Sequence, residues 1–198
     1  PVTFKFERGS RASIMSYNQD QPTVDHPLEG VSTLEDTIRS YIEKVESNGI
    51  RQHSRKWLHA KKMTIGGSSL GTLQGKNALS SATSIISEKI GLTHFRTSTA
   101  PQWGNLFEDV IKQYVEKVKN CVVYGEDAYI EGAPGSYTAY SPDGLAVVDG
   151  AITLLEFKCP YSRIPTGIPP PSYVSQVKMG LDMIPIATTG LLIEGVFR

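Results

Sequence analysis

Residues 141–160 read SPDGLAVVDGAITLLEFKCP, a stretch that predicts two short strands joined by a tight turn. The turn is placed at Asp149 and Gly150, because glycine readily adopts the positive φ that two-residue hairpin turns require. Residues 152–158 are rich in apolar and β-branched side chains, as expected for a mostly buried strand. The rest of the chain can be arranged around this predicted β-hairpin.

Charged side chains occur at particular positions in the predicted hairpin. Side chains alternate along a strand, so Glu156 and Lys158 share one face while their apolar neighbours can pack into the core on the other. Asp143 lies upstream between a proline and a glycine, where the hairpin can bring it beside Glu156. Two carboxylates held close together favour a hard cation between them, such as Mg²⁺ or Mn²⁺. The pattern therefore indicates a phosphodiester-cleaving metal site, with a solvated sheet edge as the simpler interpretation.

The remainder of the chain predicts further helices and strands. Residues 2–6 alternate apolar and polar side chains like a short strand, and residues 34–45 place apolar side chains on one face of a helix. Further helices are expected at 51–62, 77–89, 102–119 and 171–184, and further strands at 121–124, 127–131, 137–140 and 190–197. In the helix at 77–89, the side chains expected to point inward are Leu79, Ile85, Ile86 and Ile90.

Three more groups of residues carry a family resemblance together with SPDG and LLEFKCP. They are WLHAK at 57–61 with IGGS at 65–68, GNLFE at 104–108, and YVSQ at 173–176. In order and spacing, over roughly residues 51–196, they resemble the PD-(D/E)xK nucleases of the phage lambda exonuclease and YqaJ-like viral recombinase family. The resemblance implies an α/β (α+β) fold with a restriction-endonuclease-like core, in which helices flank a central mixed β-sheet.

The same resemblance implies a role for each matching residue. The catalytic residues would be Asp143, Glu156, Lys158, Glu108 and Gln176. The three carboxylates and the backbone carbonyl of Phe157 would hold two divalent ions, Mg²⁺ or Mn²⁺, which lower the pKa of an attacking water. Lys158 would orient or help deprotonate that water and stabilise charge on the phosphate. Gln176 would hold Lys158 or the phosphate in place.

A basic segment without Asp or Glu runs over residues 47–87, although the formal net charge of the chain is zero. Its charged residues are Arg51, Arg55, Lys56, Lys61, Lys62 and Lys76. Such clustering predicts contacts with DNA phosphates, and a solvated helix face would explain it equally well. By resemblance, Lys61 and Ser68 would bind the 5′-terminal phosphate of DNA. Lys61 replaces the usual arginine, and Arg55 is expected to compensate for the lost bidentate geometry.

Composition indicates one ordinary globular domain of 198 residues with a single core. Residues 32–198 are expected to form one nuclease domain, and residues 1–31, outside the resemblance, an N-terminal arm or extension. Arg198 directly follows a predicted strand, so truncation at the C-terminus stays open. No apolar run is long enough to span a bilayer, and the first residues do not resemble a signal peptide. The expected location is intracellular, in the host cell of a virus or phage, with the compartment open.

The resemblance implies a 5′ to 3′ exonuclease that degrades linear double-stranded DNA with a 5′-phosphate into mononucleotides and leaves a 3′ single-stranded tail. Its relatives form homotrimers around DNA and work with a single-strand annealing protein in recombination. Two alternatives stay open: an endonuclease of the same fold acting on DNA or RNA, and a catalytically inactive nucleic-acid-binding module. Cleavage of closed circular DNA or RNA would favour the first, and retained function after Asp143→Ala would favour the second.

Overall fold

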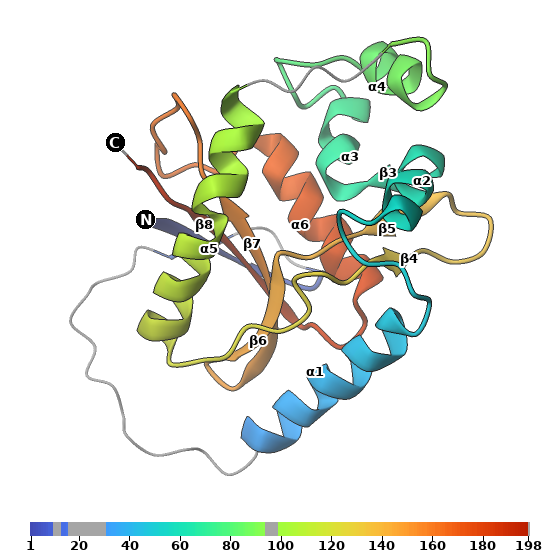
Figure 1. The fold of residues 1–198 in the computed structure, drawn as a ribbon. Helices are drawn as coiled ribbons and strands as arrows, with labels where there is room; N and C mark the ends of the chain where they lie inside the picture. The colour runs from blue at the N-terminus through green and yellow to red at the C-terminus, as the bar shows by residue number, and fades with distance from the viewer. Residues whose placement is uncertain (10–12, 16–30, 94–98, 198) are drawn as a thin grey trace.

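The structure is a computed structural model that describes residues 1–9, 13–15, 31–93 and 99–197. In these residues the chain forms one mixed sheet with helices on both faces, and a smaller sheet beside it (Figure 1). None of the helices in these ranges combines the length and apolar character that crossing a membrane requires. The α/β architecture expected from the sequence is confirmed.

The larger sheet has the strand order β2-β1-β8-β7-β6. Its strands are β1 (Val2–Glu7), β2 (Ser13–Met15), β6 (Gly144–Val148), β7 (Ala151–Lys158) and β8 (Thr189–Glu194). Strands β6 and β7 pair antiparallel through the turn at Asp149 and Gly150, whose φ angles are 51° and 76°. Strands β7 and β8 run parallel, which makes the sheet mixed. The predicted hairpin is therefore confirmed, with its turn at the expected residues.

Helices cover both faces of this sheet (Figure 1). Helix α5 (Thr99–Lys119) packs Ile111 and Val115 against Leu155 and Phe157 of β7 on one face. Helices α1 (Val31–Glu46) and α6 (Pro171–Met183) belong to a second apolar cluster, which includes Leu154 of β7 on the opposite face. Because β7 is buried on both faces, its alternation decides which side chains each helix meets. Glu156 and Lys158 consequently point to the same side as α6.

The N-terminal strand takes part in the central sheet. Strand β1 pairs antiparallel with β8 from Val2 opposite Glu194 to Glu7 opposite Thr189. Phe4 and Phe6 are buried in the same cluster as α6. The strand expected over residues 2–6 is confirmed, and the expected arm thus begins inside the core. The part of that arm at residues 10–12 and 16–30 lies outside the described ranges.

A second, smaller sheet supports the basic segment. Its strands are β3 (Ile65–Gly66), β5 (Thr138–Tyr140) and β4 (Ile130–Glu131), with β3 parallel and β4 antiparallel to β5. Helices α2 (Arg55–Met63) and α3 (Gly67–Leu73) lie next to it, and α4 (Ala82–Lys89) lies beyond α3 (Figure 1). Pairing of β3 with β5 brings the basic segment to the strand that leads into Asp143.

Two predicted helices are shorter than expected. Helix α2 begins after Ser54, whose hydroxyl oxygen accepts a hydrogen bond of 3.1 Å from the backbone N–H of Trp57. Helix α4 begins only at Ala82, and the inward packing expected of Leu79, Ile86 and Ile90 is wrong, whereas Ile85 is half-buried. Leu79 is 96% exposed, and Ile86 and Ile90 are also exposed, because the apolar core ends before it reaches α4.

Candidate active site

The hairpin register brings Asp143 and Glu156 to the same end of the sheet. Asp143 directly precedes β6, whose first residue is the register partner of Leu155. An Asp143 carboxylate oxygen accepts a hydrogen bond of 2.6 Å from the backbone N–H of Phe157. Lys158 reaches back over both acids: its ammonium donates to Glu156 and lies 4.0 Å from Asp143. Two carboxylates and one ammonium thus meet at one point, as the hairpin pattern predicts.

Glu156 is fully buried and is held by three donors. One carboxylate oxygen accepts a hydrogen bond of 2.7 Å from the hydroxyl of Tyr140. The other accepts from Lys158 and from the side-chain amide of Gln176 on α6. A buried carboxylate is costly unless it is paired and hydrogen-bonded, so these three donors fix its position.

Burial and an excess of negative charge shift the pKa values of the groups in this cluster. Burial raises the pKa of Asp143 well above its usual range, Glu156 adds to this, and Lys158 opposes it. Burial also raises the pKa of Glu108 on α5, against the opposing effect of Lys158. Burial disfavours the ammonium of Lys158, but Glu156 and Asp143 outweigh it and raise the pKa of that group. Glu108 therefore belongs to the same electrostatic neighbourhood.

The oxygen donors of this cluster fit a hard divalent cation. Within the described ranges, no three His, Cys, Asp or Glu side chains come close enough to form a metal site by themselves. Asp143 and Glu156 offer two carboxylates, and the backbone carbonyl of Phe157 would add a third oxygen. A divalent ion here would offset the burial and the repulsion from Glu156 that together raise the pKa of Asp143. The chemistry of the donor set thus suits Mg²⁺ or Mn²⁺ better than a softer metal.

A pocket lined by Tyr140 and Gln176, which both hydrogen-bond Glu156, is also lined by two of the predicted phosphate-binding residues. Lys61 and Ser68 both line it, together with Ser141 and Gln176. The ammonium of Lys61 lies 4.5 Å from the centre of the Trp57 ring, which also lines the pocket. Gln176 connects the pocket to the cluster, since its amide also hydrogen-bonds Glu156.

Arg55 is placed differently from the other two predicted phosphate ligands. It is exposed in the first turn of α2 and is not among the residues that line the pocket. Lys61 lies in the last turn of the same helix. The structure therefore brings Lys61 and Ser68 together and leaves Arg55 outside.

Sequence reasoning assigned no role to Tyr140, Tyr173 or Ser141, although Tyr173 and Ser141 begin the YVSQ and SPDG motifs. Tyr140 is buried, and burial together with Glu156 raises the pKa of its hydroxyl well above the usual range. The Tyr173 ring centre lies 5.7 Å from the ammonium of Lys158. A signal existed for all three, because Tyr140 and Ser141 directly precede Pro142 and Asp143, and Tyr173 lies three residues before Gln176 in the same motif.

Comparison with protein families and with curated proteins agrees with the family resemblance of the motifs. A family model described as the YqaJ-like viral recombinase domain matches residues 56–189. Protein D345L of African swine fever virus, isolate Tick/South Africa/Pretoriuskop Pr4/1996, is 28% identical over 174 residues, which cover 75% of this chain and 50% of that protein. Protein D345L of strain Badajoz 1971 Vero-adapted matches equally well. The chain spans about half the length of the curated relatives it matches.

Solved structures give the same fold. The alkaline exonuclease LHK-Exo from Laribacter hongkongensis superposes with a TM-score of 0.54 at 25% identity, over 67% of this chain and 69% of that one. LHK-Exo in complex with dAMP superposes with a TM-score of 0.53 at 23% identity, over 67% of this chain and 70% of that one. The nuclease fold expected from the motifs is confirmed.

Proposed function

This chain belongs to the YqaJ-like viral recombinase domain family, and from that premise we propose that it is a divalent-metal-dependent exonuclease acting 5′ to 3′ on linear double-stranded DNA. The observation that carries the proposal is that the pocket with Lys61 and Ser68 is also lined by Tyr140 and Gln176, the two side chains that hydrogen-bond Glu156. A terminal phosphate bound in that pocket would place a neighbouring phosphodiester at the carboxylates.

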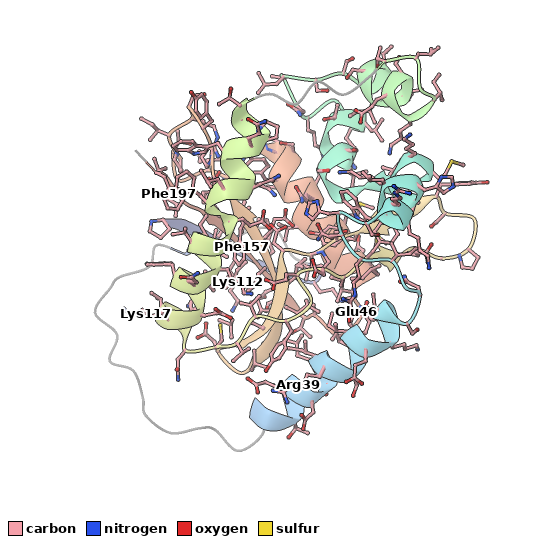
Figure 2. The ribbon with its side chains drawn as sticks, viewed as in Figure 1. Arg39, Glu46, Lys112, Lys117, Phe157 and Phe197 are labelled. Atoms are coloured by element: carbon pink, nitrogen blue, oxygen red, sulfur yellow. The ribbon has the colours of Figure 1, made fainter. Side chains whose placement is uncertain are left out.

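Each residue of the cluster has a part in the proposed hydrolysis. Asp143, Glu156, Glu108 and the Phe157 carbonyl would hold two Mg²⁺ or Mn²⁺ ions, which when bound polarise the scissile phosphate and lower the pKa of the attacking water. Lys158 would orient that water and stabilise the negative charge that develops on the phosphate. Phe157 lies near the centre of the fold (Figure 2), and the β7 residues from Ile152 to Phe157, Glu156 among them, are all buried.

Gln176 would couple end binding to cleavage. Its amide holds a Glu156 oxygen and the same side chain lines the pocket. A phosphate arriving beside Lys61 would therefore contact a residue that also positions a metal ligand. Such support around a metal ligand commonly tunes the activity of a site.

The direction of cleavage and the product depend on which end of the DNA strand binds in the pocket. Lys61 and Ser68 would bind the 5′-phosphate, with Arg55 contacting the duplex farther out, so cleavage would release 5′-mononucleotides and leave a 3′ single strand. The LHK-Exo complex contains dAMP, a deoxynucleoside monophosphate of the kind expected as product. The proposed setting is viral DNA recombination inside the host cell, as a homotrimer around DNA with a single-strand annealing protein as partner.

The test is digestion of linear duplex DNA labelled at the 5′ or the 3′ end, carrying a 5′-phosphate or a 5′-hydroxyl, beside supercoiled plasmid. Lys158→Ala is the inactive variant, and Lys117→Ala, in the last turn of α5, is its matched control. Release of 5′-terminal mononucleotides with Mg²⁺ but not with EDTA, lost only in Lys158→Ala, is the expected result. Nicking of the plasmid would support an endonuclease instead of an exonuclease. The absence of all cleavage would support a catalytically inactive binding module.

A further inference from the structure

An ion pair between a half-buried arginine and a fully buried glutamate lies one strand away from Lys158. Glu194 is fully buried on β8, where it is the register partner of Lys158 on β7. The guanidinium of Arg163, in the connection between β7 and α6, donates to one oxygen of Glu194. Among the residues that the structure describes, the other Glu194 oxygen has no hydrogen-bond partner. The proposed hydrolysis assigns no part to this pair.

The ring of Tyr173 connects the ion pair to Lys158. The guanidinium carbon of Arg163 lies 5.7 Å from the centre of this ring. The ammonium of Lys158 also lies 5.7 Å from the same centre. A cation within about 6 Å of an aromatic ring is attracted to its face. Lys158 is therefore bounded by its carboxylate partners on one side and by a ring that contacts Arg163 on the other.

Stability alone is a poor explanation for such a pair. Taking the Glu194 carboxylate fully out of water, and the Arg163 guanidinium partly, costs about as much as their attraction returns, so the pair adds little net stability. It does restrict position, because Arg163 cannot move away without leaving Glu194 buried and unpaired. The connection is fixed a second time by Tyr161, whose ring packs edge-on against Trp103 of α5 with centres 5.5 Å apart.

The backbone transmits the same restraint to Lys158. The N–H of Gly195, next to Glu194, donates a hydrogen bond of 2.9 Å to the carbonyl of Lys158. Both the backbone and the ring that border Lys158 are thus tied to residues of the ion pair. A displacement of either would move the ammonium relative to Glu156.

We propose that Arg163 and Glu194 are positioning residues, which hold the ring of Tyr173 against Lys158 and so fix its ammonium at the reacting phosphate. This inference rests on the proposed nuclease function and deepens it. Neither residue touches the scissile phosphate; both act through Tyr173 and Lys158. Loosening the pair should reduce the rate of the chemical step and leave DNA binding intact.

The test removes both charges together. Arg163→Ala alone would strand a buried carboxylate and lower stability, which would obscure the result. Arg163→Leu with Glu194→Leu replaces the pair by apolar side chains. The matched control is Lys112→Met with Glu126→Gln, which removes a surface ion pair of 2.5 Å far from β8 in sequence. Arg163→Lys keeps Glu194 paired and should retain an intermediate rate.

The expected result is a fall in kcat of about 10- to 100-fold in the double leucine variant, as for a group displaced from its productive position, with KM for DNA unchanged. The control should keep the wild-type kcat. A kcat within twofold of wild type would overturn the proposal. A raised KM with unchanged kcat would also overturn it, since Arg163 would then contact the DNA itself.

A second measurement does not depend on cleavage. In NMR spectra of lysine-labelled protein, the ε-methylene protons of Lys158, assigned by their loss in Lys158→Arg, should be shifted upfield by the Tyr173 ring. The double leucine variant should lose that shift, and an unmoved shift would overturn the proposal. If the wild-type protein cleaves no DNA while the shift is lost in the variant, the nuclease proposal fails, and what stands is that Arg163 and Glu194 hold the Tyr173 ring against Lys158.

Discussion

Adding one methyl group at Gly67 should disturb the side chains that hold Glu156 in the proposed catalytic cluster. A Cβ atom at this position would lie 2.6 Å from a ring carbon of Tyr140 and 3.0 Å from the Cγ of Gln176. These two residues donate to opposite oxygens of Glu156. Tyr140 is fully buried, so its ring cannot move away without disturbing the core. Gly67→Ala should therefore displace two of the three donors that hold Glu156.

The magnitude follows from two opposing terms. Overpacking a well-packed site costs about 1–3 kcal/mol, and alanine in place of glycine in a helix returns at most about 1 kcal/mol. The expected net loss is roughly 1–2 kcal/mol, which in a domain of this size lowers Tm by about 2–8 °C. The neighbouring Gly66→Ala is the matched control, because its Cβ would meet only a carbonyl oxygen at 3.9 Å.

The assay is urea unfolding and thermal melting of both variants beside the wild type. Gly66→Ala should be as stable as the wild type or gain up to about 1 kcal/mol, since its φ of −89° suits alanine. Gly67→Ala should lose stability and also cleave DNA more slowly. Equal stability of the two variants would refute the reasoning, because it would mean that Tyr140 and Gln176 are not packed against Gly67.

Three further predictions concern charge. Asp143→Asn should abolish cleavage but retain DNA binding in gel-shift assays, because it removes a metal ligand and keeps an acceptor for the N–H of Phe157; residual cleavage would exclude it as a ligand. Lys61→Ala should remove the preference for 5′-phosphate over 5′-hydroxyl ends, while Arg55→Ala, outside the pocket, should keep it; equal effects would place the phosphate elsewhere. The raised pKa values of Asp143 and Glu108 mean that the folded state binds more protons than the unfolded state above about pH 4. The stability of the metal-free protein should therefore fall as pH rises above that value. Added Mg²⁺ should raise Tm more at pH 8 than at pH 5. A Mg²⁺ effect on Tm that does not change with pH would argue against these carboxylates as the Mg²⁺ site.

The β6–β7 hairpin shows which features can be predicted from residues that are close together in the sequence. Alternation along β7 and the glycine of its turn fixed which side chains share a face, so Glu156 and Lys158 could be paired with Asp143 from the sequence. These relations span few residues, and backbone geometry alone decides them. The same reasoning failed at Leu79, because an apolar pattern does not state whether a partner surface exists.

The sequence by itself determined the hairpin, the amphipathic face of α5 and the residues that match the family's motifs. Only the tertiary structure decided that β1 pairs with β8 across almost the whole chain, and that Gln176 and Tyr140 meet at Glu156. It also decided that Lys61 shares a pocket with Gln176 while Arg55 does not. The physical reason is distance along the chain: local periodicity sets the direction of a side chain, whereas its partner depends on strand order and register, which form only when remote segments pack together.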